Sequence, residues 1–241
     1  MKTLIAAIGL LTRIPVPAPA DPETAGRATR WFPLVGAMIG GIYAAVAWLT
    51  KPHLPGAVVA VLVVIAEALL TGALHMDGLA DTADGFGGGR SREDILRIMR
   101  DPAIGSYGAV AIALLVAFKI AALKALLDRH SALPYLVLAP VLGRWAAAPL
   151  SCFLKYVRPA KSAPSFAGTR ELVWATIFTA AIVPALSMHR ALVCWAVVAV
   201  VTTAFGVFCY RKIGGITGDT LGAAIEISEC AVLLAALIVS R

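Results

Sequence analysis

The sequence predicts an all-α, polytopic integral membrane protein, a helical bundle of about seven transmembrane helices with its N-terminus in the cytoplasm. We expect one catalytic domain over residues 1–241. Three observations predict this class: the composition, the apolar runs and the distribution of basic residues. Of the residues, 60% are hydrophobic and 15% charged, and the mean hydropathy is +0.85. Soluble domains average about 45–50% apolar and about 25% charged residues, so one water-soluble core could not bury these side chains.

Seven apolar runs approach the length of about 20 residues that a membrane-spanning helix needs. The fifth run is short and contains Pro184, so its limits are soft. The first residues, MKTLIAAIGLL, are basic and then apolar, but Arg13 follows closely and no convincing cleavage site appears, which predicts a retained cytoplasmic or interfacial segment. The predicted spans are residues 32–50, 55–74, 108–127, 133–154, 172–187, 191–210 and 221–240.

The basic residues predict the orientation of these spans, because Lys and Arg accumulate in cytoplasmic loops. With seven spans, the side that holds the N-terminus receives Lys2, Arg13, Arg27, Arg30, Arg90, Arg92, Arg97, Arg100, Lys155, Arg158, Lys161, Arg170, Arg211 and Lys212. The opposite side receives only Lys51, Arg129, Arg190 and Arg241. The N-terminus is therefore predicted inside the cell and the C-terminus outside.

Cysteine usage and net charge exclude little. The four cysteines are scattered singly without the spacing of a zinc site, which is typical of small core residues in helices. The net charge of +7 comes mostly from the cytoplasmic loops, so it does not indicate a nucleic-acid partner. A basic cytoplasmic rim would still attract phosphorylated substrates and anionic lipid headgroups of the bilayer.

The stretch HMDGLADTADGF, residues 75–86, carries three aspartates directly after an apolar run. Asp77, Asp81 and Asp84 are spaced i, i+4 and i+7, which places them on one face of a helix, where like charges repel. A bound cation would offset that repulsion, and Mg²⁺ typically takes one or two carboxylates together with substrate phosphates. A solvated helix end or capping aspartates would also account for the pattern. The absence of interleaved Lys favours a site for metal or phosphate.

A second acidic motif, GGITGDTLGAAIEISEC, covers residues 214–230. Asp219, Glu226 and Glu229 fall on one side of a helix together with Gly222, whose small size lets a backbone or ligand come close. Glu226 and Glu229 lie inside the last predicted span, where ionisable groups are costly and by default functional. Asp219 alone could be a helix N-cap. Both motifs are predicted at the cytoplasmic face, so we hypothesise that they converge on a shared metal site.

The segment after the first motif suits an anionic substrate. GFGGGR, residues 85–90, could be a loop whose amides approach a phosphate, although a flexible connector fits equally. SRED, residues 91–94, is typical of a capping box that opens a short helix ending before Pro102.

Several basic groups and one histidine are candidates for substrate contacts. Lys119 and Arg144 lie within predicted spans and need partners, either substrate phosphates or, for one of them, Glu67. Simple anchoring at the cytoplasmic face would also account for the arginines of residues 92–100. The candidate substrate-binding residues are His75, Arg97, Arg100, Lys119 and Arg144.

Taken together, five motifs resemble the adenosylcobinamide-GDP ribazoletransferase (cobalamin synthase) family, in the family's order and over most of the chain. These motifs are HMDGLADTADGF, RDPAIGSYG, LTRIPVP, FPLVGAMIG and GGITGDTLGAAIEISE. Met76 and Pro102 are mild departures from its pattern. The resemblance implies an inner-membrane enzyme of late cobalamin assembly, and the predicted topology directs its active site toward the cytoplasm. Such an enzyme joins adenosylcobinamide-GDP to α-ribazole or its 5′-phosphate, uses Mg²⁺ and releases GMP. Neighbouring corrinoid-pathway enzymes are plausible partners from the family alone.

Within that resemblance, the two acidic motifs take roles in phosphoryl transfer, which depends mainly on alignment and on neutralisation of charge. We expect the metal ligands to be Asp77, Asp81, Asp84, Asp219 and Glu226. We expect the catalytic carboxylates, one of which takes the proton from the attacking hydroxyl, to be Asp81, Asp84, Glu226 and Glu229.

Two other functions remain open on the residues. A CDP-alcohol phosphotransferase also uses membrane-helix aspartates, but DGLADTAD lacks the Arg and the spaced tail of that pattern. A cation-coupled transporter would place carboxylates within spans, but it should show internal repeats and acids near the midplane of the membrane.

Overall fold

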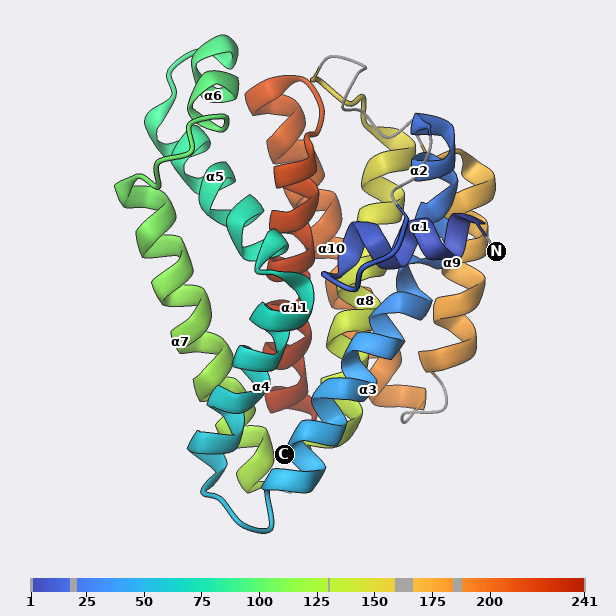
Figure 1. The fold of residues 1–241 in the computed structure, drawn as a ribbon, viewed down its shortest axis with the longest axis vertical. Coiled ribbons are helices and arrows are strands. Elements are labelled where there is room, and N and C mark those ends of the chain that lie inside the picture. The colour runs from blue at the N-terminus through green and yellow to red at the C-terminus, as the bar shows by residue number, and fades with distance from the viewer. Residues whose placement is uncertain (1, 18–20, 130, 159–166, 184–187, 241) are drawn as a thin grey trace.

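The computed structural model describes residues 2–17, 21–129, 131–158, 167–183 and 188–240, and this part of the chain is helical apart from loops and one isolated β-bridge (Figure 1). The helices before the bend described below are α1 (Lys2–Leu11), α2 (Pro22–Ala28), the 3₁₀ turn η1 (Thr29–Trp31), α3 (Phe32–Thr50) and α4 (Gly56–Thr71). Those after it are α5 (Leu74–Gly88), α6 (Arg92–Ile98), α7 (Ser106–Asp128), α8 (Ala132–Phe153), α9 (Thr169–Ile182), α10 (Met188–Ile213) and α11 (Gly218–Val239).

Five described helices are long and apolar enough to cross a membrane, and α4 with α5 makes a sixth candidate if this pair, bent by 89°, counts as one span. The prediction of a polytopic helical membrane protein is therefore confirmed. The count of seven is not. The run 172–187 corresponds to α9, whose 14 residues extend about 21 Å, less than the hydrocarbon core of about 30 Å. Residues 184–187, Lys161 and Arg241, which also entered the topology prediction, lie outside the described residues.

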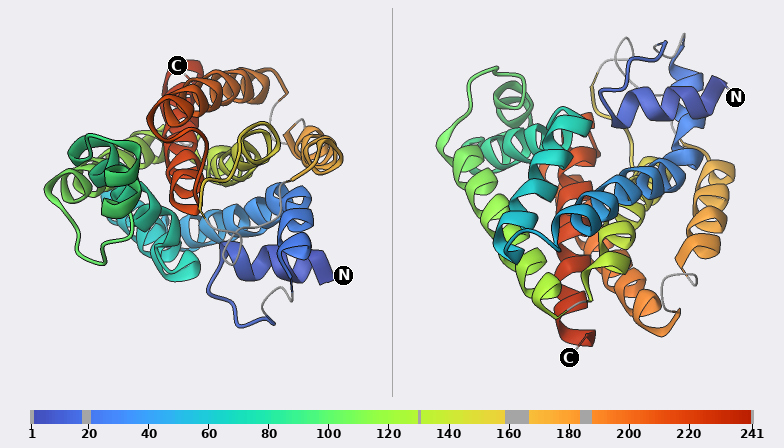
Figure 2. Two further views of the ribbon diagram at one scale, coloured as in Figure 1. Left: turned by 90° about the horizontal axis from the view of Figure 1, so that it is seen from above. Right: turned by 60° about the horizontal axis from the view of Figure 1, so that its bottom comes forward.

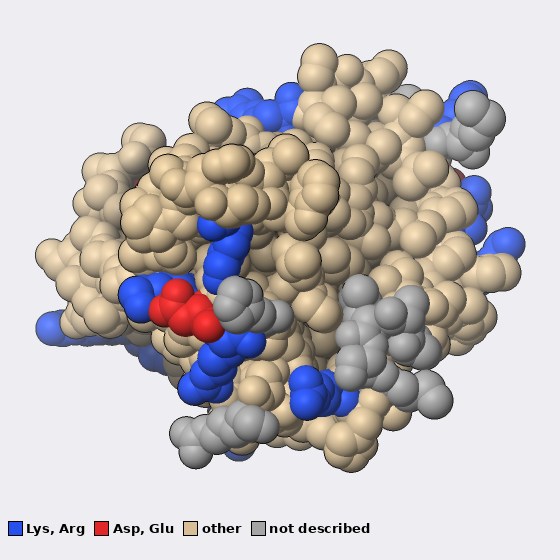
Figure 3. Space-filling model, turned by 90° about the horizontal axis from the view of Figure 1, so that it is seen from below, with Lys and Arg blue, Asp and Glu red and all other residues tan. Residues whose placement is uncertain are grey.

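The outer surface of the bundle is apolar, as a lipid-facing surface must be. Large hydrophobic side chains are exposed on several helices, with exposed fractions of 74% for Leu69, 69% for Val200 and 66% for Leu114. Helix α11 lies at the centre, packed against α5, α8, α10 and α7, while α3 runs along α8 (Figures 1 and 2). The end that carries the α3–α4 and α7–α8 connections is largely uncharged, with scattered Lys and Arg around one acidic patch (Figure 3).

A sharp bend separates α4 from α5. Helix α4 ends at Thr71, and Gly72 and Ala73 follow in the left-handed region with φ of 64° and 55°. The segment after α1 docks on this bend: the Arg13 amide donates to the Leu70 carbonyl at 2.8 Å, and its side chain occupies the space where a Cβ on Gly72 would lie. The predicted span 55–74 is thus cut short, and the acidic motif begins a new helix with its own direction.

The expected glycine-rich loop is wrong for residues 85–88, because α5 continues through Gly88. A Cβ on Gly85 would lie 2.5 Å from Met99 Cγ and 3.2 Å from the Ile95 carbonyl oxygen, so this glycine lets α6 pack directly on α5. The helix predicted from SRED is confirmed, with the Ser91 side chain accepting from the Asp94 amide at 3.1 Å. The glycines serve helix packing and do not form a phosphate-binding loop.

Candidate active site

Helices α5 and α11 cross closely at two glycines, and this contact brings the two acidic motifs together. A Cβ on Gly78 would lie 2.8 Å from the Asp219 carbonyl oxygen, and a Cβ on Gly222 would lie 3.2 Å from the Cα of His75. Small residues allow backbones to approach in this way. The crossing therefore sets Asp77 and Asp81 of α5 beside Asp219 in the first turn of α11. We call these three residues the aspartate group.

The aspartate group brings like charges together. Asp81 lies within reach of the negative charges of Asp219 and Asp77 and of the positive charge of Arg158. Within the part of the chain that the structure describes, neither Asp77 nor Asp81 forms an ion pair. Like charges at this spacing repel even in water, and a nearby cation would relieve them.

Arg158 is a site residue that the sequence analysis counted only as a topology signal. It forms an ion pair with Asp219 and donates to the Met99 carbonyl at 3.0 Å. Its position depends on an isolated parallel bridge between Tyr156 and Ile216, in which the Ile216 amide donates to the Lys155 carbonyl at 2.8 Å. No local pattern marks a bridge between segments about 60 residues apart, so the sequence offered no signal for this contact.

Asp84 has a different task from its neighbours on α5. Its two carboxylate oxygens accept from the Gly105 amide at 2.7 Å and from the Gly108 amide at 2.8 Å. These amides belong to the N-cap and first turn of α7, where backbone donors lack helical partners and a negative charge is favoured. Asp84 therefore caps α7 from α5. Asp219 is not the N-cap of α11, since Thr217 fills that position with its side chain accepting from the Thr220 amide.

A cavity of about 270 Å³ adjoins the aspartate group. Asp77, Asp219 and Tyr156 contribute to its lining, and most of the other lining residues are apolar. Burial raises the pKa of the Tyr156 hydroxyl above its ordinary value, so this group stays protonated at neutral pH. The cavity is thus a mostly apolar space that two carboxylates also line.

His75 also lines this cavity and is 3% exposed. Its buried Nδ1 has no hydrogen-bond partner among the described residues. An unsatisfied buried polar atom costs about 1–3 kcal/mol, so a ligand that bonds to it would recover this energy. The prediction that His75 contacts substrate remains a proposal, supported by its place on the cavity wall.

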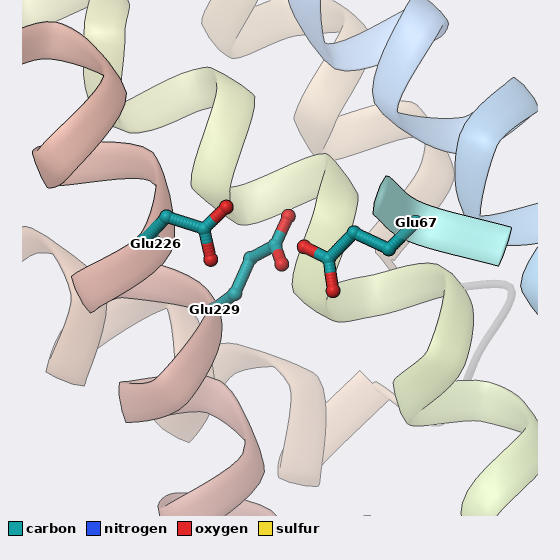
Figure 4. A group of neighbouring side chains, drawn as sticks. All are labelled: Glu67, Glu226 and Glu229. Atoms are coloured by element: carbon teal, nitrogen blue, oxygen red, sulfur yellow. The ribbon is translucent and has the colours of Figure 1, made fainter. Parts of the chain in front are cut away.

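The second group of acids forms a network in the centre of the bundle (Figure 4). The carboxylates of Glu67 on α4 and of Glu226 and Glu229 on α11 point toward one another, and all three lie within 4.8 Å at their nearest oxygens. Lys119 on α7 donates to them at 2.5, 2.6 and 2.8 Å, respectively. Arg144 on α8 pairs with Glu229. We call these five residues the buried ion network.

The network differs from the expected arrangement of site residues. Glu226 is seven residues beyond Asp219, about 10 Å farther along the helix axis, and it and Glu229 contact Lys119 instead of joining the aspartates. Lys119 and Arg144 are 2% and 0% exposed, with donors directed at glutamates. Glu67 was expected to pair with one of these two basic residues, and it pairs with Lys119.

The arginines predicted to contact phosphate lie on or after the exposed helix α6. Arg97 bonds to Asp94 and holds the pKa of that carboxyl below its ordinary value. Arg100 is exposed just beyond the helix end. Neither lines the cavity, so their role in binding phosphate remains a prediction.

Two sets of oxygens are candidates for a metal, but among the described residues the aspartate group does not bring three ligand atoms within 4.8 Å of one another, as the glutamates do. The glutamates of the buried ion network are the closest set among the described residues, but Lys119 already supplies a cation to all three. The aspartate group is more open and lacks an equivalent cation. It fits the Mg²⁺ pattern of few carboxylates completed by water and phosphate oxygens better than the closed glutamate set does.

Comparison with known proteins gives a consistent result over nearly the full length. The family model described as cobalamin-5-phosphate synthase matches residues 3–237. The adenosylcobinamide-GDP ribazoletransferase of Ralstonia nicotianae is 40% identical over 240 residues, covering 96% of this chain and 93% of that protein. A protein of the same description from a Shewanella species is 41% identical, and the match covers 98% of this chain and 93% of that protein. Another from Prosthecochloris aestuarii is 38% identical, and the match covers 98% of this chain and 97% of that protein. No solved structure matches significantly.

Proposed function

The chain belongs to the cobalamin-5-phosphate synthase family of membrane transferases, and we propose that it joins adenosylcobinamide-GDP to α-ribazole or its 5′-phosphate with release of GMP. The reaction is the attack of a ribose hydroxyl on the phosphorus attached to cobinamide, with GMP as leaving group. The observation that supports this site most directly is the position of the aspartate group beside a cavity, at the crossing of α5 and α11. Its three carboxylates have one neighbouring arginine, Arg158, to balance their charge.

In this proposal Asp77, Asp81 and Asp219 are the residues that would hold Mg²⁺. When bound, Mg²⁺ would neutralise charge on the phosphate oxygens and orient them for in-line displacement. The chain's own residues prepare the site: Gly78 and Gly222 set the distance between the helices, and Arg158 restrains the Asp219 carboxylate. A carboxylate of the aspartate group takes the proton of the attacking hydroxyl.

The remaining predicted residues take supporting roles in the proposal. Asp84 positions α5 against α7, since both its oxygens are used by amides. Glu226, Glu229, Lys119 and Arg144 keep the central helices aligned beneath the site. Arg97 and Arg100, which do not line the cavity, attract the anionic substrate by long-range charge.

We place the protein in the cytoplasmic membrane with this site facing the cytoplasm, on the support of the basic loops predicted at that face. Membership of the cobalamin-5-phosphate synthase family removes the support for a transporter and for a CDP-alcohol phosphotransferase.

The test uses purified protein in lipid nanodiscs with both substrates, with and without Mg²⁺, and follows GMP release. We expect activity that EDTA abolishes and Mg²⁺ restores. Asp219→Asn should lower kcat at least a hundredfold, whereas Asp128→Asn, at the far end of α7, should not change it. Unchanged metal dependence and rate in Asp219→Asn would rule out the assignment.

A further inference from the structure

The cavity beside the aspartate group is too small for both substrates. Its volume of about 270 Å³ falls just under the range of about 300–1,000 Å³ typical of pockets that bury drug-sized ligands. One nucleoside fits such a space, whereas a corrin macrocycle with its side chains is several times larger. The cavity and the corrinoid must therefore occupy different parts of the protein.

Building on the proposed function, we infer that this cavity is the acceptor pocket, which takes the aromatic base of α-ribazole and directs its ribose toward the aspartate group. Along α11 the lining changes from Asp219 to the apolar side chains of Leu221 and Ile225. Ile225 lines the pocket six residues beyond Asp219 on α11, about 9 Å along the axis, and Leu11 and Phe32 complete its apolar wall.

The mostly apolar lining suits the base of the acceptor better than the guanine of the donor. Guanine carries hydrogen-bond donors and acceptors around its edge, and each one buried without a partner costs free energy. A benzimidazole base presents mainly apolar edge and one free ring nitrogen. The pocket lining is mostly apolar, and one of its polar atoms, Nδ1 of His75, is buried without a partner among the described residues. Its other polar side chains are those of Thr29, Asp77, Ser151, Tyr156 and Asp219. A ring nitrogen or a ribose hydroxyl of the nucleoside satisfies Nδ1 of His75.

Two variants change the pocket without touching the aspartate group. Ser151→Phe on α8 fills it, and Leu221→Ala on α11 enlarges it. A second cavity of about 200 Å³, lined by Trp48, Lys51 and Leu133, provides matched controls at another site, Leu133→Phe and Leu133→Ala. Size-exclusion profiles of all variants in detergent establish that they fold.

The first measurement is equilibrium binding of radiolabelled α-ribazole to each protein without the donor, so it does not depend on turnover. We expect Ser151→Phe to weaken binding at least tenfold and Leu133→Phe to leave it within twofold. Wild-type binding that Ser151→Phe does not weaken would overturn the inference, even if GMP release proceeds normally. Loss of GMP release in the wild type with intact, Ser151-sensitive binding would overturn the proposed reaction and leave the pocket assignment standing.

The second measurement is steady-state kinetics with each substrate varied in turn. Ser151→Phe should raise the KM for α-ribazole at least tenfold and change that for adenosylcobinamide-GDP less than twofold. Leu221→Ala, but not Leu133→Ala, should improve use of a riboside with a tricyclic base relative to α-ribazole by at least fivefold. A change confined to the KM of adenosylcobinamide-GDP would assign the pocket to the donor nucleotide and overturn the inference.

Discussion

The aspartate group and the buried ion network are both clusters of carboxylates on α11 and a neighbouring helix, yet they differ in how their charge is balanced. In the network, Lys119 contacts three glutamates and Arg144 contacts one of them, all shielded from solvent. In the aspartate group, Arg158 pairs with Asp219, while Asp81 faces the charges of its neighbours. The network supplies its own cations and holds helices together. The aspartate group leaves a charge for a ligand to neutralise.

The largest effect on stability should come from removing the central cation of the network. Lys119→Met leaves three buried carboxylates with Arg144 alone, and breaking a buried ion pair in this way costs about 3–5 kcal/mol. Lys124→Met on the same helix breaks only an exposed pair with Asp128, worth about 0–1 kcal/mol. Thermal unfolding in detergent compares the two. Equal stabilities would show that the network is not structural.

Asp81→Asn should show the reverse pattern, a large loss of activity without loss of stability. Removal of one charge relieves the repulsion from Asp219 and Asp77, so the unfolding temperature should stay constant or rise slightly. The kcat for GMP release should fall about a hundredfold or more, the scale of losing one electrostatic contact to a transition state. If Asp81→Asn lost stability and activity in parallel, the aspartate group would be structural, like the buried ion network.

Gly78→Ala tests whether the helix crossing sets the geometry of the aspartate group. The new methyl would lie 2.8 Å from the Asp219 carbonyl oxygen, so α5 and α11 must separate at a cost of about 1–3 kcal/mol. We expect a loss of activity larger than the loss of stability implies. Gly41→Ala is the matched control, because its Cβ meets nothing within 4 Å and the replacement favours the helix. Activity in both variants is followed by GMP release.

The smallest effect is expected from a variant that tests the role of Arg158. Arg158→Gln removes the positive charge paired with Asp219, and the aspartate group then attracts a divalent cation more strongly. We expect the Mg²⁺ concentration for half-maximal activity to fall about threefold, equivalent to about 0.7 kcal/mol, while kcat also declines because Asp219 is less restrained. An increase in the Mg²⁺ requirement would instead make Arg158 a positioning residue for the substrate phosphates.

The fold class and the approach of the two acidic motifs could be predicted from the sequence, because apolar runs and helical spacing are local properties. The division of the acidic residues between the aspartate group and the buried ion network could not be predicted in this way. Asp219 and Glu226 share one helix face, and only the positions of α5 and α7 decide which of them meets an aspartate and which meets Lys119. Likewise, Gly85 carries the composition of a loop, but its contact with Met99 makes it a packing residue.

The capping of α7 by Asp84 has a mechanical consequence. Helix α7 is held at its first turn by a residue of the acidic motif and, about 20 Å farther along, by Lys119 at the centre of the bundle. If a bound substrate shifts α5, either α7 moves with it or the two hydrogen bonds from the α7 amides to Asp84 lengthen. Helix α7 therefore connects the buried ion network in the membrane interior with the acidic motif on α5.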